Sequence, residues 1–182
     1  MNIPEIDHEK ILIERYGKVI LERYFSDPDG ETRDFLLWGG KTPPVIVLPL
    51  TPEKKVIALL QFRRGANECI LEIPGGGTNP KEDILVSAGR ELTEETGYVA
   101  DKLTKLGKPI WLDPASCFTP FMPVLATDCK KDGEQKLDET EKMEIGGLLL
   151  IDWTDWLKMI YEGDICDSKT IAVTFLAQRY VC

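Results

Sequence analysis

The sequence lacks any apolar run long enough to cross a membrane, and it lacks an excess of positive charge. Its 22 Lys and Arg residues against 31 Asp and Glu residues give a formal net charge of −9, which disfavours non-specific binding to nucleic acid or to an anionic membrane. Residues 1–8 include acidic side chains where a signal peptide would be basic and then apolar. We therefore expect a cytoplasmic protein that binds neither nucleic acid nor membrane.

Cysteine is also scarce, and the sequence contains no internal repeat or low-complexity segment. The five cysteines are an odd number without metal-binding or redox spacing: Cys69, Cys117, Cys129, Cys166 and Cys182. We expect them to be free thiols in a reducing compartment. A chain of 182 residues with 43% hydrophobic and 29% charged residues is typical of one globular domain, with room for a small terminal extension.

Short apolar runs between turn residues predict the strands. We expect two β-rich runs around Gly17, a turn at residues 27–30, and strands at 32–38, 45–50, 56–62, 103–112, 123–127 and 148–153. Near the end of the chain, a short helix at 155–162 would begin after Thr154 as N-cap. A closing helix at 171–181 would turn Ile171, Phe175 and Leu176 inward.

One stretch predicts an amphipathic helix with unusual acidity. Over residues 84–96, Leu85, Ala88 and Leu92 recur at helical spacing and form an apolar stripe. Glu91 and Glu95 are four residues apart on another face, with Glu94 adjacent. Because like charges at this spacing repel, a cation is expected among them. Clustered carboxylate oxygens suit Mg²⁺, which also binds substrate phosphates.

The ends of this helix are specified locally. Asn79 is a good N-cap, with Pro80 at the first helical position and Glu82 at the third, and a start at Asp83 fits nearly as well. Gly97 stands where a left-handed C′ residue is wanted. Before the helix, the glycines at 75–77 let the backbone approach a metal or a phosphate closely.

These residues together resemble the Nudix box of the Nudix hydrolase superfamily. The matching pattern is Gly76, five residues, Glu82, seven residues, and then Arg90-Glu91-Leu92-Thr93-Glu94-Glu95-Thr96-Gly97-Tyr98. The resemblance implies an α/β fold, an α/β/α sandwich with a mixed sheet, and a loop–helix–loop that binds divalent metal. It also implies hydrolysis of a nucleoside diphosphate linked to another moiety.

The resemblance further implies roles for single residues. Glu91 and Glu95 would be the principal metal ligands, with Glu94 assisting and the carbonyl of Gly75 as a further ligand. Arg90 would hold the box carboxylates in place, and Glu82 would act in support. The implied cofactor is Mg²⁺, or Mn²⁺ in its place.

Two further stretches resemble the branch of ADP-ribose and ADP-sugar pyrophosphatases: Gln-Phe-Arg at 61–63 and Leu-Glu-Ile-Pro-Gly-Gly at 71–76. In that branch the residues matching Arg63 and Glu72 face the substrate, and Arg63 suits a phosphate. Alternatively, Arg63 is a surface charge at a strand end and Glu72 belongs to a structural ion pair. Pro114 matches a proline of the branch, although the residues around it differ, which leaves the sugar preference open.

The polar segment 130–144 reads as a loop. In the same branch, a glutamate-rich loop here closes over the active site and supplies a metal ligand or the general base. Glu139 and Glu141 match those positions best. The alternative is an exposed charged loop without a catalytic role.

The first 40 residues form a separate unit in this interpretation, followed by a Nudix domain at 41–182. By resemblance, residues 1–40 are a β-rich extension that packs against a second subunit in a homodimer. The alternative is that these strands extend the sheet of the domain itself.

The sequence hypothesis is metal-dependent hydrolysis of ADP-ribose or another ADP-sugar, giving AMP and a sugar phosphate. One rival is a sensor module that binds a nucleotide sugar without cleaving it, although the box carboxylates are all present. Other rivals are Nudix enzymes acting on dinucleoside polyphosphates, nucleoside triphosphates or capped RNA. The absence of a basic groove argues against RNA.

Overall fold

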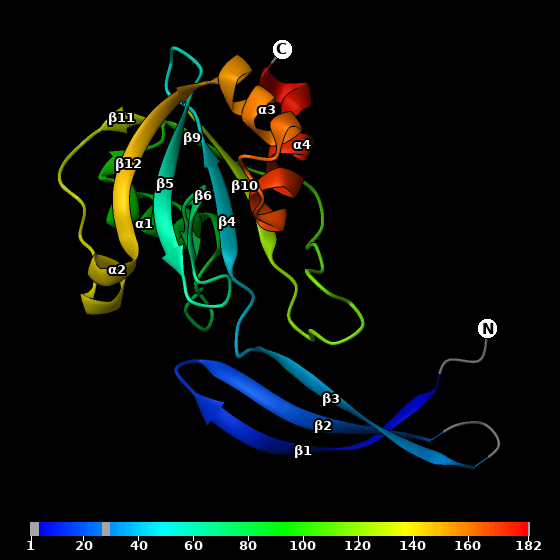
Figure 1. Ribbon diagram of the computed structural model, residues 1–182. Helices are drawn as coiled ribbons and strands as arrows, with labels where there is room; N and C mark the ends of the chain where they lie inside the picture. Colours follow the sequence, from blue (N-terminus) through cyan, green and yellow to red (C-terminus); the bar gives the residue numbers. More distant parts are fainter. Residues whose placement is uncertain (1–3, 27–29, 182) are drawn as a thin grey trace.

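The computed structural model describes residues 4–26 and 30–181. Strands β1 (Glu5–Arg15), β2 (Lys18–Ser26) and β3 (Thr32–Gly40) form an antiparallel sheet in that order. The expected break at Gly17 is confirmed, because Tyr16 and Gly17 both adopt left-handed backbone conformations in the β1–β2 turn. The turn predicted at residues 27–30 lies mostly outside the described residues. Figure 1 shows this sheet standing apart from the rest of the chain.

The remaining strands form the body of the molecule. Parallel strands β4 (Val45–Pro49) and β10 (Met122–Thr127) are flanked by antiparallel β7 (Gly75–Gly76) and β9 (Lys102–Lys105). Strand β5 (Lys55–Arg63) pairs antiparallel with β6 (Glu68–Glu72) and β12 (Ile145–Asp152). The short β8 (Tyr98–Val99) pairs with β11 (Lys130–Lys131). The body therefore mixes parallel and antiparallel pairs.

Helices cover both sides of these strands. Along β4, Val45 and Val47 pack in the cluster with α1 (Ile84–Thr96), whereas Ile46 and Leu48 pack in the opposite cluster. This alternation is expected for a strand that is buried on both faces. The second cluster includes α3 (Trp153–Glu162) and α4 (Ser168–Val181). The α/β/α sandwich with a mixed sheet is confirmed.

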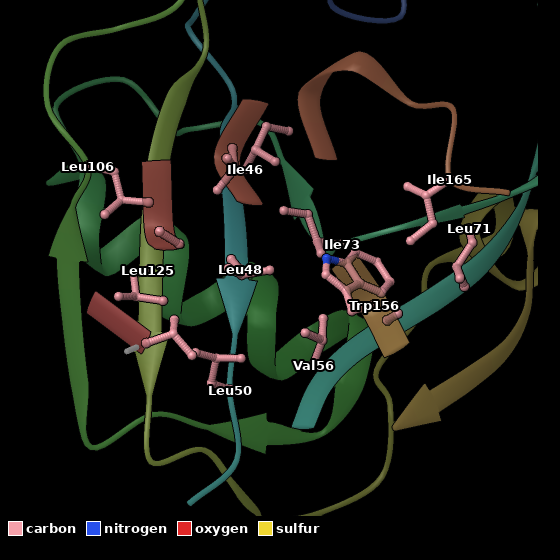
Figure 2. Close-up of a cluster of buried hydrophobic side chains, with 14 of the residues drawn as sticks. Ile46, Leu48, Leu50, Val56, Leu71, Ile73, Leu106, Leu125, Trp156 and Ile165 are labelled. Carbon is pink, nitrogen blue, oxygen red and sulfur yellow. The ribbon is translucent and has the colours of Figure 1, made fainter. Parts of the chain in front are cut away.

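The cluster under α3 and α4 includes Trp156, the largest fully buried side chain of the described residues (Figure 2). Its indole Nε1 donates a hydrogen bond to Thr174 Oγ1 at 3.0 Å. Because a buried indole N–H needs a partner, this bond joins α3 to α4, while the indole ring fills the core.

Among the described helices, none is both long and apolar enough to span a membrane.

Some sequence predictions were wrong at the level of elements. The strand expected at 103–112 ends at Lys105, because Gly107 has a left-handed φ of 101° and Pro109 cannot donate to a ladder. Helix α3 begins at Trp153 after Asp152, not after Thr154. Helix α4 begins at Ser168, within the predicted turn.

The inward face of α4 also differs from the prediction. Phe175 is 71% exposed, whereas Ile171 and Leu176 are partly buried. The buried stripe consists of smaller residues: Thr170, Val173, Thr174, Ala177 and Val181. Small side chains let the helix approach the sheet closely, so the largest apolar residues of the helix did not define its packed face.

The segment expected to be a loop at 130–144 contains β11 and a short helix, α2 (Glu139–Glu144). The helix follows from a capping box that the sequence prediction overlooked. The Asp138 side chain accepts from the backbone N–H groups of Thr140 and Glu141, and Glu141 accepts from the N–H of Asp138.

Candidate metal and phosphate site

Helix α1 carries the acidic side chains of the site. Asp83 is its N-cap, accepting from Leu85 N–H, and Gly97 is its left-handed C-cap. The later of the two predicted starts is therefore correct. Ala88 and Leu92 are fully buried in the core. Glu91 and Glu95, each three residues further along the helix, are only 6% and 5% exposed.

The glycine loop passes directly over this acidic face. Gly75 and Gly76 pair with β4, and the Gly75 N–H donates to Glu95 Oε2 at 2.9 Å. A Cβ at Gly76 would overlap the carboxylate of Glu91. Glycine is therefore required at 76 for the close approach of backbone and carboxylate. Gly75 meets the acidic group through its amide, and the predicted role of its carbonyl stays a prediction.

Arg90 connects several of the predicted residues. Its Nη1 lies 2.8 Å from Glu91 Oε1 and 3.0 Å from Glu94 Oε2. Its Nη2 donates to Gly77 O at 2.9 Å and lies 3.3 Å from Glu82 Oε2. This is the contact pattern expected for a residue that holds the box carboxylates in place.

Glu82 lies at the approach to α1. The Ser87 hydroxyl donates to Glu82 at 2.7 Å, and this bond together with Arg90 lowers the pKa of Glu82 to about 2. A carboxylate that stays ionised in this way continues to orient Arg90 over the whole physiological pH range. Glu82 thus supports the arrangement from the start of the helix.

Three carboxylates converge into a group that could hold a metal ion. Ligand oxygens of Glu91, Glu95 and Glu141 all lie within 4.8 Å of one another. Burial, which is the largest cause, and the nearby Glu91 and Glu141 together raise the pKa of Glu95 to about 8, although the Gly75 hydrogen bond lowers it. Burial also raises the pKa of Glu91, although Arg90 opposes this. Buried, mutually repelling carboxylates fit a divalent cation, which would remove the cost of their charge.

Glu139 and Glu141, the two glutamates predicted to act from the loop, lie in different environments. Glu141 comes from α2 and completes the three-carboxylate group, whereas Glu139 is exposed at the start of the same helix. Glu94 lies outside the group, with 40% of its side chain exposed and Arg90 as its partner. Whether Glu94 and Glu139 act in catalysis stays a prediction.

Arg63 and Glu72 lie on the same side of the β5–β6 ladder as α1. Every second residue of β5 faces the same side, so Arg63 shares a face with Ile57, which packs in the α1 cluster. Arg63 Nε and Nη2 donate to the two Glu72 oxygens at 2.7 and 2.9 Å. Glu72 is only 2% exposed, so this bidentate pair compensates a buried charge. The arrangement agrees with the structural alternative and leaves a substrate role for either residue as a prediction.

Pro114 lies in a different place. It lines a cavity of about 490 Å³ between the N-terminal sheet and residues 111–118, with Arg23, Phe35 and Trp111. The cavity beside the glutamates is about 400 Å³ and shares no lining residue with it in the described chain. The predicted substrate contact of Pro114 is therefore not brought to the acidic group in this chain.

The sequence prediction overlooked several polar residues around the group. Two of these residues, Lys136 and Asp138, line the cavity beside the glutamates. The full lining of that cavity is Gly77, Thr78, Asn79, Arg90, Glu91, Glu94, Lys136, Asp138 and Glu141. Arg64 and Glu144 form an ion pair at the end of α2. The Gln61 side-chain nitrogen is buried without a hydrogen-bond partner among the described residues. The capping pattern from Asp138 to Glu141 was the available signal for α2.

Comparisons with known proteins agree with this geometry. The family model described as the NUDIX domain matches residues 40–161. An ADP-ribose pyrophosphatase of Bacillus subtilis (strain 168) is 35% identical over 160 residues, which are 85% of this chain and 82% of that protein. A methanol dehydrogenase activator of Bacillus methanolicus is 34% identical over 158 residues, 82% of this chain and 79% of that protein.

A solved structure agrees as well. The crystal structure of an ADP compounds hydrolase superposes with a TM-score of 0.83, covering 100% of this chain and 95% of that chain at 19% identity. This likeness concerns the fold. With the domain match, the relatives and the acidic group of the box, the chain belongs to the Nudix hydrolase family.

Proposed function

We propose that this protein hydrolyses the diphosphate of a nucleoside diphosphate sugar, with ADP-ribose as the first candidate and AMP and ribose 5-phosphate as products. The observation that carries the proposal is the convergence of Glu91, Glu95 and Glu141 from two helices, beside a cavity that also contains Arg90 and Lys136. The relative named ADP-ribose pyrophosphatase supports the choice of substrate.

The residues present fit a divalent cation, Mg²⁺ or Mn²⁺. Bound there, the cation would supply positive charge that offsets the diphosphate and the charge developing on its oxygens. Glu91, Glu95 and Glu141 would hold it, and Arg90 fixes the orientation of Glu91. Lys136, which lines the same cavity as Glu91 and Glu94, would contact a substrate phosphate. Glu141 or its neighbour on α2, Glu139, would accept the proton of the attacking water.

The test is hydrolysis of a substrate panel with Mg²⁺ and with chelator. The panel contains ADP-ribose, ADP-glucose, GDP-mannose, NADH, diadenosine polyphosphates and nucleoside triphosphates. We expect metal-dependent cleavage concentrated on ADP-sugars, with AMP identified as a product. Cleavage confined to polyphosphates would instead assign the enzyme to that rival class.

A sensor without turnover remains the rival from another class. The relative named as an activator of methanol dehydrogenase is about as similar as the pyrophosphatase, so a protein-directed role also has a specific observation behind it. Binding of ADP-ribose in a thermal-shift assay without cleavage of any panel member would favour this reading and contradict the enzymatic one.

We also propose that residues 1–40 are a dimerisation extension to the hydrolase domain of residues 41–182. The whole of β1 is exposed in the single chain, including Ile11 at 58% and Ile13 at 50%. Exposed apolar residues along an edge strand favour a protein partner. A homodimer in the cytoplasm is the simplest assembly that would cover them, and light scattering measures its mass directly.

A further inference from the structure

Helix α2 carries Glu141 without an apolar anchor of its own. None of its residues is buried, and its one apolar side chain, Met143, is 79% exposed. A helix of this length is not stable by itself in water. The contacts at its two ends must therefore decide where Glu141 lies.

The N-terminal side of α2 is tied to α1. Lys136 N–H donates to Glu94 O at 2.7 Å, and the Gln135 side-chain amide donates to Glu95 O at 2.5 Å. The capping box then places one oxygen of Glu141 2.7 Å from the Asp138 N–H. These bonds fix the start of α2, and its end leads directly into β12, whose first residue Ile145 pairs with Gln61 of β5.

Beside this strand pairing, charge also holds the C-terminal side. Glu144 Oε1 lies 2.9 Å from Arg64 Nη2, and Glu144 Oε2 lies 3.7 Å from Arg63 Nη1. Only 17% of the Glu144 side chain is exposed. An acidic residue at a helix C-terminus is otherwise unfavourable, so these arginines offset its cost. Figure 1 shows α2 below the start of β12 and beside the end of β5. Arg63 is the last residue of β5, and Arg64 follows it.

We propose that Arg64 and Glu144 are positioning residues that hold α2 so that Glu141 reaches Glu91 and Glu95. Glu141 and Glu144 are three residues apart and share one side of the helix, so fixing Glu144 orients Glu141. Arg63 is committed to Glu72 through two nitrogens, which leaves Arg64 as the closer partner. This inference rests on the proposed function for the identity of the three-carboxylate group as a metal site.

The first test uses Arg64→Gln, Glu144→Gln and the double variant, with Mn²⁺ binding followed by electron paramagnetic resonance. We expect each single variant to weaken Mn²⁺ binding about tenfold. The double variant should be no weaker than the singles, since both remove the same ion pair. Arg64→Lys should recover part of the affinity. The matched control is Lys158→Gln, which breaks an exposed ion pair with Glu162 on α3. Mn²⁺ binding by Arg64→Gln equal to that of the control would overturn the proposal.

A second readout does not depend on metal or turnover. In chelated protein, amide hydrogen exchange at residues 139–144 should be at least about tenfold faster in Arg64→Gln than in the control, with the core strands unchanged. Unchanged exchange in α2 would contradict the positioning role even if the enzyme hydrolyses ADP-ribose. Faster exchange together with no hydrolysis by the wild-type protein would retain the positioning role and reject the proposed function.

Discussion

At the scale of single residues, the site concentrates negative charge where water is excluded. Glu95 is 5% exposed and is faced by Glu91, Glu141 and, through longer-range attraction, Arg63. Such an arrangement is costly in the metal-free protein and favourable once a cation is bound. Charge burial therefore couples folding, pH and metal binding at this one carboxyl group.

The stability of the metal-free protein should fall as pH rises. The pKa of Glu95 is about 8 in the folded state against a usual value of 4.5, so the folded state retains a proton that the unfolded state releases. The stabilisation is complete below pH 4.5 and is lost as pH rises through 8. We expect a loss on the order of 3 kcal/mol between pH 5 and pH 8 in urea denaturation with chelator.

Glu95→Gln should remove most of that pH dependence, because an amide does not titrate. Added Mg²⁺ should reduce the decline in the wild-type protein, since it favours the ionised carboxylate. An equal slope in the variant and the wild type would show that another group carries the effect.

Gly76 offers a test of close approach at the same scale. In Gly76→Ala, the new methyl group would overlap the carboxylate of Glu91, which can rotate away. We expect Mn²⁺ affinity to fall about tenfold while the unfolding midpoint changes little. Gly77→Ala is the matched control, because a Cβ there meets no atom within 4 Å. Equal affinity in the two variants would contradict the placement of Glu91.

At the scale of elements, the C-terminus of α1 organises the segment that leads to α2. The carbonyls of Thr96 and Gly97 accept from Lys131 Nζ at 3.1 Å and from Asp132 N–H at 2.9 Å. These bonds satisfy the last carbonyls of the helix and fix the segment that follows β11. The cap of one helix thus sets the path to the third carboxylate.

Gly97→Ala should destabilise the protein by more than the backbone strain alone, because the new side chain would also disturb the docked segment. Gly97 has a φ of 71°, and a Cβ there would overlap the carbonyl of Gly133. Gly163→Ala is a matched control at the left-handed C-cap of α3, where a Cβ meets nothing within 4 Å. In urea denaturation, we expect the control to lose about 1 kcal/mol and Gly97→Ala about 1 kcal/mol more. Equal losses of stability in the two variants would contradict this prediction, because the docked segment would then move away at no cost.

The helices and strands also show which features could be predicted from the sequence and which could not. Helix α1 was predicted because its periodicity and caps are local signals. Gly97 caps the helix as expected, whereas the N-cap is Asp83, the second of the two predicted starts, and not Asn79. The burial of Thr170 and the exposure of Phe175 depend on how closely α4 approaches the sheet, which no local pattern records. Likewise, the convergence of Glu141 with Glu91 and Glu95 depends on the docking of residues 131–136, and Arg64–Glu144 joins segments 80 residues apart.

At the scale of the whole molecule, the N-terminal sheet contacts the body through a narrow region. Trp38 exchanges backbone hydrogen bonds with Ser116 and Phe118 at 2.9 and 3.0 Å, and Phe118 packs on Val19, Leu21 and Leu37. Much of the sheet remains exposed in the single chain, which is the basis of the proposed homodimer.

Ile11→Glu should convert the proposed homodimer into a monomer, because it places a charge in the exposed apolar run of residues 11–13 without emptying a core position. Light scattering measures the mass. Phe175→Glu is the control, since Phe175 is a comparably large exposed residue, 71% accessible, on α4. A wild-type protein that is already monomeric, or an Ile11→Glu variant that stays dimeric, would contradict the proposed interface.

The central claim is that the three-carboxylate group binds the metal that hydrolysis requires. The most direct measurement is Mg²⁺-dependent cleavage of ADP-ribose by the wild-type protein, by Glu95→Gln and by the surface control Glu162→Gln. We predict a loss of about a hundredfold or more in kcat/KM for Glu95→Gln and wild-type activity for the control. Metal-dependent cleavage by Glu95→Gln at the wild-type rate would contradict the claim.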